Sequence, residues 1–266
     1  MNANIHAEPL LKVQGLNLRY PGARDGAYAV QDASLELHPG EVLAIVGESG
    51  SGKSSLLNCI AGRIACAPGH VHYRRASESW VDVHALPERE RRLLARTEWG
   101  FVEQHAADGL RMNVSAGANV GERLMALGER RFDTLRDQGR QWMSAVELDA
   151  ERIDDSPRAF SGGMRQRLQI ARNLVTHPRL VLMDEPTSGL DVSVQARLLD
   201  LIRSLVARLH LSALIVTHDL GVARLLAQRT LVMRQGRIVE QGLTDRVLDD
   251  PQHPYTQLLV SSVVAP

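Results

Sequence analysis

Hydrophobic and polar residues alternate along the first part of the chain and then give way to an unbroken apolar run. Alternation around Leu11–Val13 and again over Ala33–Leu37, with Pro21 and Gly22 between them, predicts two antiparallel strands joined by a loop. Val42–Val46 is continuously apolar, which is typical of a strand buried on both faces of a mainly parallel sheet. The pattern therefore predicts an α/β core that includes an antiparallel β region.

The middle of the chain has helical spacing instead. Val120–Leu127 and Arg136–Val146 follow it with few β-branched residues, and we interpret residues 105–178 as a helical subdomain inserted into the core. Buried strands return at Leu180–Met183 and Ala213–Val216.

A hairpin and a helical tail complete the pattern. Thr230–Arg234 and Arg237–Glu240 predict two strands that turn at Gln235-Gly236, and the chain is helical from Leu243 onward. We therefore expect one domain over residues 1–266. Its α/β core with the antiparallel β subdomain comprises residues 1–104 and 179–242, its helical subdomain residues 105–178, and its C-terminal extension residues 243–266.

Composition narrows the class of protein. The 266 residues are 44% hydrophobic, enough for one sizeable core or two fused subdomains. Lys plus Arg equals Asp plus Glu at 31 each, so no global field attracts nucleic acid or an anionic membrane. We see no signal peptide and no apolar run of the roughly 18 to 20 residues that a membrane helix needs. Cys59 and Cys66 are too few for a disulfide framework. We therefore expect a cytoplasmic protein with reduced thiols and no direct membrane insertion.

A glycine-rich segment between the first apolar run and a predicted helix matches the phosphate-loop pattern in full. Glycines there let backbone N–H groups turn inward around phosphates, at the positive end of the following helix. Lys53 would neutralise the β- and γ-phosphates and Ser54 would ligate Mg²⁺. The flanking strand and the helix over Lys53–Ile60 argue against a chance turn rich in Gly and Ser. We assign ATP binding to the whole segment: Gly47, Glu48, Ser49, Gly50, Ser51, Gly52, Lys53, Ser54 and Ser55.

Two carboxylates follow the strand predicted at Leu180–Met183. Asp184 and Glu185 would lie at the carboxyl edge of the sheet beside the phosphate loop. Asp184 would hold the Mg²⁺ shell, and Glu185 would orient the attacking water and accept its proton. Such a pair alone is more often a turn or a helix cap, so the catalytic interpretation depends on the loop.

A second phosphate-binding element is indicated by Phe160–Arg167, FSGGMRQR, which opens another helix. With LLKVQGLNLRY, GESGSGKS, FVEQH, LVLMDEP, SGLD and VTHD in this order, essentially the whole chain resembles ATP-binding cassette (ABC) ATPases. The resemblance implies a RecA-like, mainly parallel core sheet with an antiparallel β subdomain and an inserted helical subdomain. It also implies ATP hydrolysis by a head-to-tail dimer, either of two copies or with a related cassette.

The resemblance assigns further site residues. Tyr20 would stack on adenine, with Tyr28 as a substitute, although Tyr20 could simply pack against the loop. Gln104 would sense Mg²⁺ and the attacking water, and His218 would contact the γ-phosphate. A lone Gln or His is usually structural, so their position in the ordered set carries these assignments.

Contacts across the dimer are implied as well. Ser161, Gly162 and Gly163 would touch the γ-phosphate of ATP held by the opposite subunit, and Asp191 would cross the dimer seam. Met164 stands where the common signature has Gln, and its side chain cannot make the hydrogen bonds of an amide. Any role for Met164 must therefore rest on packing. The substitution resembles the oligopeptide-importer branch.

Other stretches resemble the K-subunit branch, from the carbon–phosphorus lyase system that breaks down phosphonates: Arg96–Gly100, Asp108–Arg111, Val114–Ala126, Arg152–Asp155 and Leu243–Thr256. In that branch the ATPase is soluble and docks on the lyase core, chiefly through its J subunit, and it does not drive a permease. The segment His105–Met112, where importers contact a permease, is our candidate docking loop. An ordinary connection between subdomains is the alternative for this segment.

Two other functions were weighed. The tail His253-Pro254-Tyr255-Thr256 is shared with oligopeptide-type importers, so an energy-coupling subunit of a peptide or nickel importer is the alternative. A factor acting on DNA or ribosomes is disfavoured by the zero net charge, by the single cassette and by the lack of a long coiled-coil insertion.

Overall fold

The computed structural model describes residues 8–22 and 27–264, and the chain separates into two compact units. The first comprises residues 1–91 and 210–266, and the second comprises residues 92–209. The predicted helical segment 105–178 falls within the second unit, together with residues 92–104 and 179–209. The subdomain boundaries expected from the sequence stay a prediction.

An antiparallel sheet forms the first part of the first unit. Its strand order is β2-β1-β4-β5, from Val30–Leu37, Leu11–Leu18, Val71–Arg74 and Trp80–Asp82. The alternating pattern correctly predicted β1 and β2, which pair antiparallel with Leu11 opposite Leu37. The short strands β4 and β5 were not predicted, although β4 alternates between buried and half-buried residues.

A second set of strands in this unit carries the predicted phosphate loop. Its order is β10-β9-β3-β8, from Arg237–Leu243, Arg229–Arg234, Val42–Val46 and Ser212–Thr217. β3 pairs parallel with both β8 and β9, and β9 turns back into antiparallel β10. The turn falls at Gln235 and Gly236, both with positive φ, as the sequence predicted.

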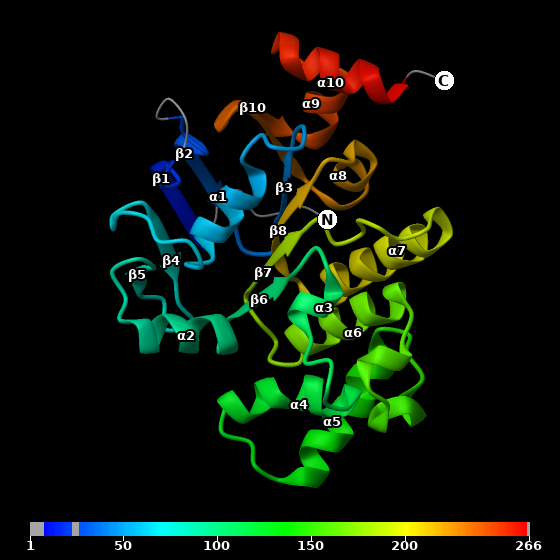
Figure 1. Ribbon diagram of the computed structural model, residues 1–266. Helices are drawn as coiled ribbons and strands as arrows, with labels where there is room; N and C mark the ends of the chain where they lie inside the picture. Colours follow the sequence, from blue (N-terminus) through cyan, green and yellow to red (C-terminus); the bar gives the residue numbers. More distant parts are fainter. Residues whose placement is uncertain (1–7, 23–26, 265–266) are drawn as a thin grey trace. The chain divides into compact units, whose positions relative to one another are not determined.

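Short helices complete the first unit: α1 (Lys53–Ile60), α8 (Leu220–Leu226), α9 (Thr244–Asp249) and α10 (Pro254–Val264). Helix α2 (Glu88–Thr97) runs across the boundary between the units. One core cluster joins Val46 and Val232 of the sheet to Leu248 of α9 and Tyr255 of α10. Figure 1 shows α9 and α10 near β10 at the C-terminal end of the chain, and α8 packs against α9, β3 and β8.

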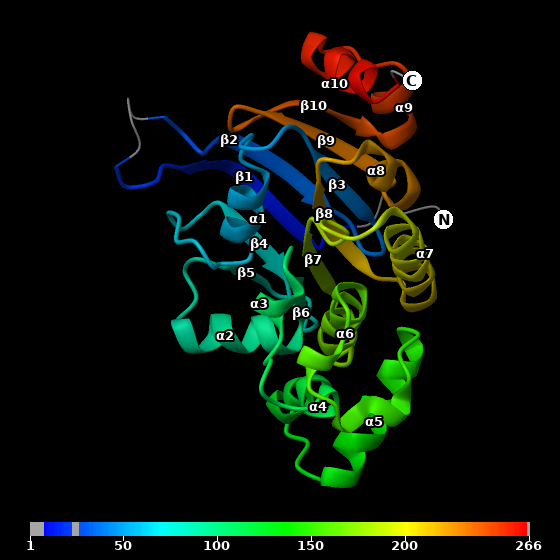
Figure 2. The same ribbon diagram turned by 45° about the vertical axis from the view of Figure 1, so that its right-hand side comes forward.

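The second unit is mainly helical around two parallel strands. β6 (Trp99–Val102) pairs with β7 (Leu180–Asp184), and Val102 lies opposite Met183. The helices are α3 (Ala106–Gly109), α4 (Ala116–Ala126), α5 (Phe132–Ala145), α6 (Gly162–Leu174) and α7 (Val192–Leu209). Single 3₁₀ turns, η2 (Ala150–Asp154) and η3 (Pro157–Ala159), connect α5 to α6. Figure 2 shows α4 and α5 side by side below α6.

Buried amides on α6 bind strand β6. Asn173 is 4% exposed, and its side chain accepts from the N–H of Phe101 at 3.0 Å and donates to the carbonyl of Phe101 at 2.9 Å. These bonds give the N–H and the carbonyl of Phe101 side-chain partners, and a buried N–H or C=O without a partner would destabilise the fold. The helix that begins with the predicted signature is therefore bonded directly to the strand that leads to Gln104.

Candidate functional site

The predicted phosphate loop lies between a fully buried strand and a helix in the first unit. All of β3 is buried, and α1 begins at Lys53 after Gly52, whose φ of 102° favours glycine. A Cβ added at Gly47 or Gly52 would lie 2.2 Å from the carbonyl oxygen of Met233 or Ala29, respectively. Only glycine therefore allows the loop to lie this close to the neighbouring backbone.

The side chain of Lys53 turns back over this loop. It is 4% exposed, and its Nζ donates to the carbonyl oxygens of Gly47 and Glu48, both at 2.8 Å. The Oγ of Ser51 is buried with no hydrogen-bond partner in the described part of the chain. An ammonium and a hydroxyl are both donors that phosphate oxygens can accept from. The loop thus fits the phosphates of a nucleotide.

Tyr20 and Tyr28, the two tyrosines predicted for the adenine, differ in how accessible their rings are. Tyr20 is 45% exposed as a residue, and its hydroxyl lies 3.1 Å from the Oγ of Ser55 on α1. The ring of Tyr28 is covered by the guanidinium of Arg19 at 3.8 Å from the ring centre. Tyr20 therefore presents a face on which a base could stack, at the helix that carries the loop.

His218 follows β8 on the same side of the unit as the phosphate loop. β8 runs parallel to β3 with Thr217 opposite Val46, so both strands end at one edge of the sheet. His218 is exposed, and the next residue, Asp219, accepts from the N–H of Gly221 at 2.8 Å and caps α8. The histidine predicted to contact the γ-phosphate thus lies at the edge where the loop begins.

In the second unit, parallel β6 and β7 bring Gln104 and Glu185 together. The Nε2 of Gln104 donates to the Oε2 of Glu185 and to the Oγ of Ser188, both at 3.3 Å. Glu185 has a φ of 41°, a left-handed conformation that costs energy outside glycine and is often retained at functional sites. The predicted water-sensing amide and the predicted base are therefore neighbours.

Metal binding was predicted for three residues with suitable oxygen donors. Asp184 and Gln104 in the second unit and Ser54 in the first supply carboxylate, amide and hydroxyl oxygens, which are the ligand types that Mg²⁺ takes. Asp184 ends β7 and is 8% exposed. The chemistry of these donors fits, and the magnesium role stays a prediction.

The predicted signature begins helix α6. Ser161 is its N-cap, and its Oγ accepts from the N–H of Met164 at 3.3 Å. Gly163 is buried, and a Cβ there would lie 2.5 Å from Cγ1 of Val194 on α7. Ser161, Gly163 and Met164 also line an open hollow of about 260 Å³. Asp191 is exposed just before α7. The structure therefore presents the N-terminus of α6 at the surface of the unit.

Met164 packs against an arginine that holds the segment before the signature. One guanidinium nitrogen of Arg152 lies 4.0 Å from the Sδ of Met164, and the guanidinium stacks 4.6 Å from the ring centre of Phe160. Arg152 also donates to the carboxylate of Asp155 at 2.6 Å and to the carbonyl of Ala159 at 3.2 Å. The packing role expected for Met164 has this arginine as its neighbour.

Sequence reasoning missed the residues that position Gln104. Gln166 and Gln169 of α6 are 3% and 0% exposed, and both bond the backbone of Glu103, the residue before Gln104. Polar residues on the buried face of a helix were the signal that could have revealed them, since a buried amide must find a partner.

The candidate docking loop is an ordered segment of the second unit. It contains α3, and the side chain of the fully buried Asn119 bonds both the N–H and the carbonyl of Arg111, at 2.8 and 3.0 Å. This anchoring fixes the end of the loop against α4.

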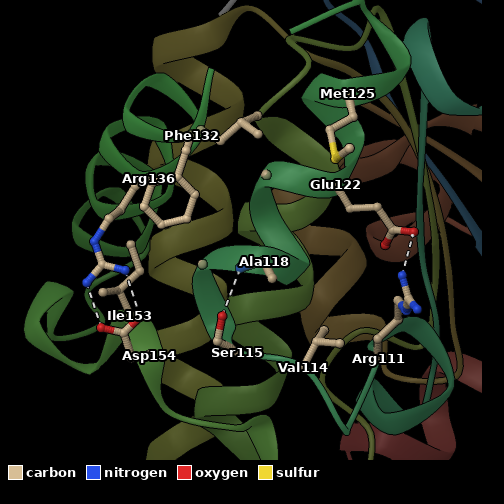
Figure 3. Close-up of a pocket in the computed structure, with 13 residues that line it drawn as sticks. Arg111, Val114, Ser115, Ala118, Glu122, Met125, Phe132, Arg136, Ile153 and Asp154 are labelled. Carbon is tan, nitrogen blue, oxygen red and sulfur yellow. Dashed lines mark hydrogen bonds and ion pairs between the residues drawn. The ribbon is translucent and has the colours of Figure 1, made fainter. Parts of the chain in front are cut away.

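A cavity of about 290 Å³ opens beside this end of the loop, between α4, α5 and η2 (Figure 3). Its apolar lining is Val114, Ala118, Met125, Phe132, Leu135 and Ile153. Arg136 pairs with both carboxylate oxygens of Asp154 at 2.7 and 2.6 Å on one side, and Arg111 lies 3.3 Å from Glu122 on the other. Phe132 is 71% exposed and Met125 is 45% exposed at its mouth. The cavity is therefore an apolar recess flanked by neutralised charge pairs.

No helix in the described ranges, 8–22 and 27–264, is both long and apolar enough to cross a membrane.

Comparison with known proteins agrees with this arrangement. Residues 30–188 match the family model described as ABC transporter, and residues 239–266 match that of the C-terminal region of oligopeptide and dipeptide transporters. The chain is 61% identical to the putative phosphonates utilization ATP-binding protein PhnK of Escherichia coli, over 97% of this chain and 98% of that protein. It is 34% identical to the oligopeptide transport ATP-binding protein OppD of Bacillus subtilis, over 97% and 73% of the two chains.

Solved structures show the same fold. The ATP-binding cassette MJ0796, in a dimeric structure bound to ADP and Pi, superposes with a TM-score of 0.77 at 27% identity, covering 88% of this chain and 98% of that one. CbiO1 from Clostridium perfringens gives 0.77 at 25% identity, with 92% of each chain covered. The α/β cassette fold predicted from the sequence is confirmed. This chain therefore belongs to the ABC family of ATP-binding proteins and is an ATP-hydrolysing cassette.

Proposed function

We propose that this ATPase serves the carbon–phosphorus lyase system in the cytoplasm, where ATP binding and hydrolysis drive a conformational change in the lyase complex during phosphonate breakdown. The observation that carries the proposal is the 61% identity to a phosphonate-utilization ATP-binding protein over 97% of this chain. Relatives named for peptide import match at 34 to 37% identity. Phosphonate utilization is accordingly favoured over import.

ATP is held, in this proposal, with its phosphates on the Gly47–Ser55 loop and its base on Tyr20. Glu185 takes the proton of the attacking water. Gln104 orients that water with its side-chain amide, which in this structure donates a hydrogen bond to Glu185. His218 contacts the γ-phosphate. A bound Mg²⁺ would neutralise developing charge on the phosphate oxygens.

The signature completes the site in trans. The N-terminus of a helix attracts anions because its first N–H groups have no partner within the helix. Helix α6 presents such an end at Ser161–Gly163, and we propose that it meets the γ-phosphate bound to a second cassette, with Asp191 at the seam. Support comes from the dimeric MJ0796 cassette, which shares the fold. The second cassette is either another copy or a related chain.

Docking on the lyase core, with the J subunit as the expected contact, is assigned to the His105–Met112 loop and the cavity beside it. The two arginines at the rim are each paired with an acid, so the recess offers apolar surface rather than net charge. Exposed aromatic and Met side chains around an apolar pocket are typical of protein interfaces. An apolar side chain from a segment of the lyase core would fit.

The second candidate is the energy-coupling subunit of an oligopeptide or nickel importer. It is favoured by the match of residues 239–266 to the C-terminal region of peptide transporters. The same loop would then receive a permease, so the docking surface alone does not separate the two functions.

Copurification separates them. The tagged chain is coexpressed either with the lyase core or with permease subunits, and the membranes of the second culture are solubilised in detergent. The lyase core should copurify with the tagged chain, and the permease subunits should not. Phe132→Ser combined with Met125→Ser should remove most of the bound lyase core while basal ATP hydrolysis persists. Leu258→Ser is the matched control, because Leu258 on α10 is 64% exposed and lies outside the cavity. Retention of the permease without the lyase core would overturn the proposal.

Catalysis is tested by Glu185→Gln. This variant should bind ATP, fail to turn it over and accumulate a closed dimer in gel filtration with light scattering. Wild-type hydrolysis rates would exclude Glu185 as the base.

The trans arrangement is tested by mixing subunits. Ser161→Arg and Lys53→Ala subunits are each inactive alone in this proposal, and their mixture should recover activity because one composite site of the mixed dimer is intact. Mass spectrometry of the intact assembly verifies that mixed dimers form, and their inactivity would count against contact in trans.

A further inference from the structure

A tyrosine of the C-terminal extension contacts the phosphate loop. Tyr255 is the second residue of α10 and belongs to the tail motif that this chain shares with oligopeptide-type importers. Its side chain is 3% exposed, and its hydroxyl accepts a hydrogen bond from the backbone N–H of Glu48 at 3.1 Å. The tail and the loop belong to the same compact unit.

Tyr255 and Lys53 bond opposite sides of the same peptide group, which joins Gly47 to Glu48. The N–H of Glu48 and the carbonyl of Gly47 belong to the same planar peptide unit. Tyr255 binds the N–H, and the Nζ of Lys53 donates to the carbonyl at 2.8 Å. Because the unit is rigid, the tyrosine hydroxyl fixes the direction in which this carbonyl points, and with it the position of the ammonium.

Tyr255 is itself held by contacts that are independent of the loop. Its ring packs in the core cluster with Val232 and Leu248, and the guanidinium of Arg234 lies 4.8 Å from its ring centre. Its N–H donates to the Nδ1 of His253 at 3.1 Å. Glu240 of β10 accepts from the backbone N–H of His253 at 3.0 Å, which ties the start of α10 to the sheet. Packing of the ring in the core therefore fixes the position of the Tyr255 hydroxyl.

Backbone groups of the β9–β10 hairpin also anchor the loop. The N–H of Gly236 in the β9–β10 turn donates to the carbonyl of Ser51 at 2.9 Å, and the backbone of Met233 lies where a side chain of Gly47 would be. The tyrosine thus adds a side-chain anchor at the entry of the loop, where Glu48 and Ser49 are exposed.

We propose that Tyr255 is a positioning residue of the ATP site, which orients the Gly47–Glu48 peptide and so places Lys53 for the nucleotide phosphates. The inference rests on the proposed role of the phosphate loop. It gives the tail motif a function in the cassette itself, whichever partner the cassette serves. The hydroxyl contributes by reducing the freedom that the loop loses when ATP binds.

Tyr255→Phe tests the inference, because it keeps the buried ring and removes only the hydroxyl. In the full-length chain we expect the Kd for ATP, measured by calorimetry, to rise about three- to tenfold, the range for one lost hydrogen bond. The KM for ATP should rise in parallel with little change in kcat, and the melting temperature of the nucleotide-free protein should stay close to that of the wild type. Tyr73→Phe on β4 is the matched control for loss of a buried phenol hydroxyl and should leave the Kd unchanged.

Two outcomes overturn the inference: a Kd in Tyr255→Phe equal to that of the wild type, or an equal rise in Tyr73→Phe. Lys53→Ala distinguishes this failure from failure of the proposed site. If Lys53→Ala loses ATP binding and Tyr255→Phe does not weaken it, only the positioning role is wrong. If Lys53→Ala binds ATP as the wild type does, the assignment of the phosphate loop falls as well.

Discussion

The phosphate loop and the signature both precede the N-terminus of a helix, but their backbones have different conformations there. The loop bends around its helix end with Gly47, Gly50 and Gly52 at positive φ. The signature has an extended Ser161 as the N-cap, with Gly162 and Gly163 already inside α6. A bent loop can surround a phosphate with N–H groups, whereas a bare helix end meets it from one side. In the proposed composite site we therefore expect the signature to contact the phosphate from one side only.

Their anchors differ as well. The loop is pressed against backbone, including the carbonyls of Met233 and Ala29. The signature is held mainly by side chains, since Arg165 donates to the carbonyls of Pro157 and Phe160, and Arg152 stacks on Phe160. Backbone cannot move aside without distorting a sheet or a turn, but a side chain can adopt another rotamer. We therefore expect the loop to tolerate substitution less than the signature does.

The largest expected effect comes from Gly52→Ala. The added Cβ meets the backbone carbonyl of Ala29 at 2.2 Å, and the φ of 102° is strained for alanine. We expect the free energy of unfolding to fall by about 3 kcal/mol or more, and ATP binding to be lost. Urea denaturation and calorimetric titration measure both.

Gly50→Ala is the matched control for that substitution. Gly50 also has a positive φ, 79°, but nothing lies within 4 Å of its added Cβ. Strain alone then remains, and we expect a loss of about 1 to 2 kcal/mol. Equal destabilisation of Gly52→Ala and Gly50→Ala would show that the close approach of the Ala29 carbonyl is not what excludes a side chain at position 52.

A smaller effect is expected for Gly163→Ala in the signature. The new Cβ would lie 2.5 Å from a methyl group of Val194, which is a side chain and can shift. We expect destabilisation of about 1 to 3 kcal/mol and reduced hydrolysis, with the Kd for ATP on the phosphate loop unchanged.

Val194→Ala should restore most of the stability and hydrolysis in the Gly163→Ala background, because it removes the clashing methyl group. Gly162→Ala is the control, since its Cβ would make only an ordinary contact with Leu190 at 3.6 Å. Additive effects of Gly163→Ala and Val194→Ala would contradict the contact, as residues that touch should couple.

Most of the architecture could be predicted because its signals are local. The alternation in β1, the apolar run of β3 and the Gln235-Gly236 turn each determine their own backbone. The short strand β5 could not be predicted, because all of its residues are only half buried and no periodicity results.

Site residues divide in the same way. Lys53 and Ser161 stand in motifs, so their positions follow from a few neighbouring residues. Tyr255 bonds Glu48 of the phosphate loop, which lies 207 positions earlier in the sequence. Arg152 stacks on Phe160, 8 positions later, just before the signature. No spacing rule encodes either contact. Buried Gln169 could have been noticed as a polar residue on an apolar helix face, but its partner, Glu103, is visible only in the structure.

Arg152→Ala should affect the signature alone. It removes the stacking on Phe160, the contact with Met164 and the bond to the carbonyl of Ala159. We expect kcat to fall about three- to tenfold while the Kd for ATP is unchanged, because the phosphate loop keeps its own anchors. Arg158→Ala, which loses only a hydrogen bond to Asn113, is the control in the same steady-state assay. A changed Kd in Arg152→Ala would contradict the separation of the two segments.

The smallest effect is expected at the far end of the helix that carries the phosphate loop. The Cys59 thiol in the last turn of α1 lowers the pKa of Cys66 below that of an ordinary thiol through a hydrogen bond, and His84 lowers it further. The thiol of Cys66 should therefore ionise at a lower pH than an ordinary cysteine, and its alkylation by iodoacetamide should rise less steeply with pH between about 6.5 and 8.5. An ordinary thiol would react about tenfold faster per pH unit over most of this range.

Cys59→Ala should restore that pH dependence, because it removes the hydrogen bond that lowers the pKa of Cys66 most. The alkylated wild type should bind ATP with an unchanged Kd, since Cys59 lies at the opposite end of α1 from Lys53. Weaker ATP binding after alkylation of Cys66 would show that the loop depends on the whole helix. The end of α1 would then count among the contacts that hold the loop in place, together with those at the entry of the loop.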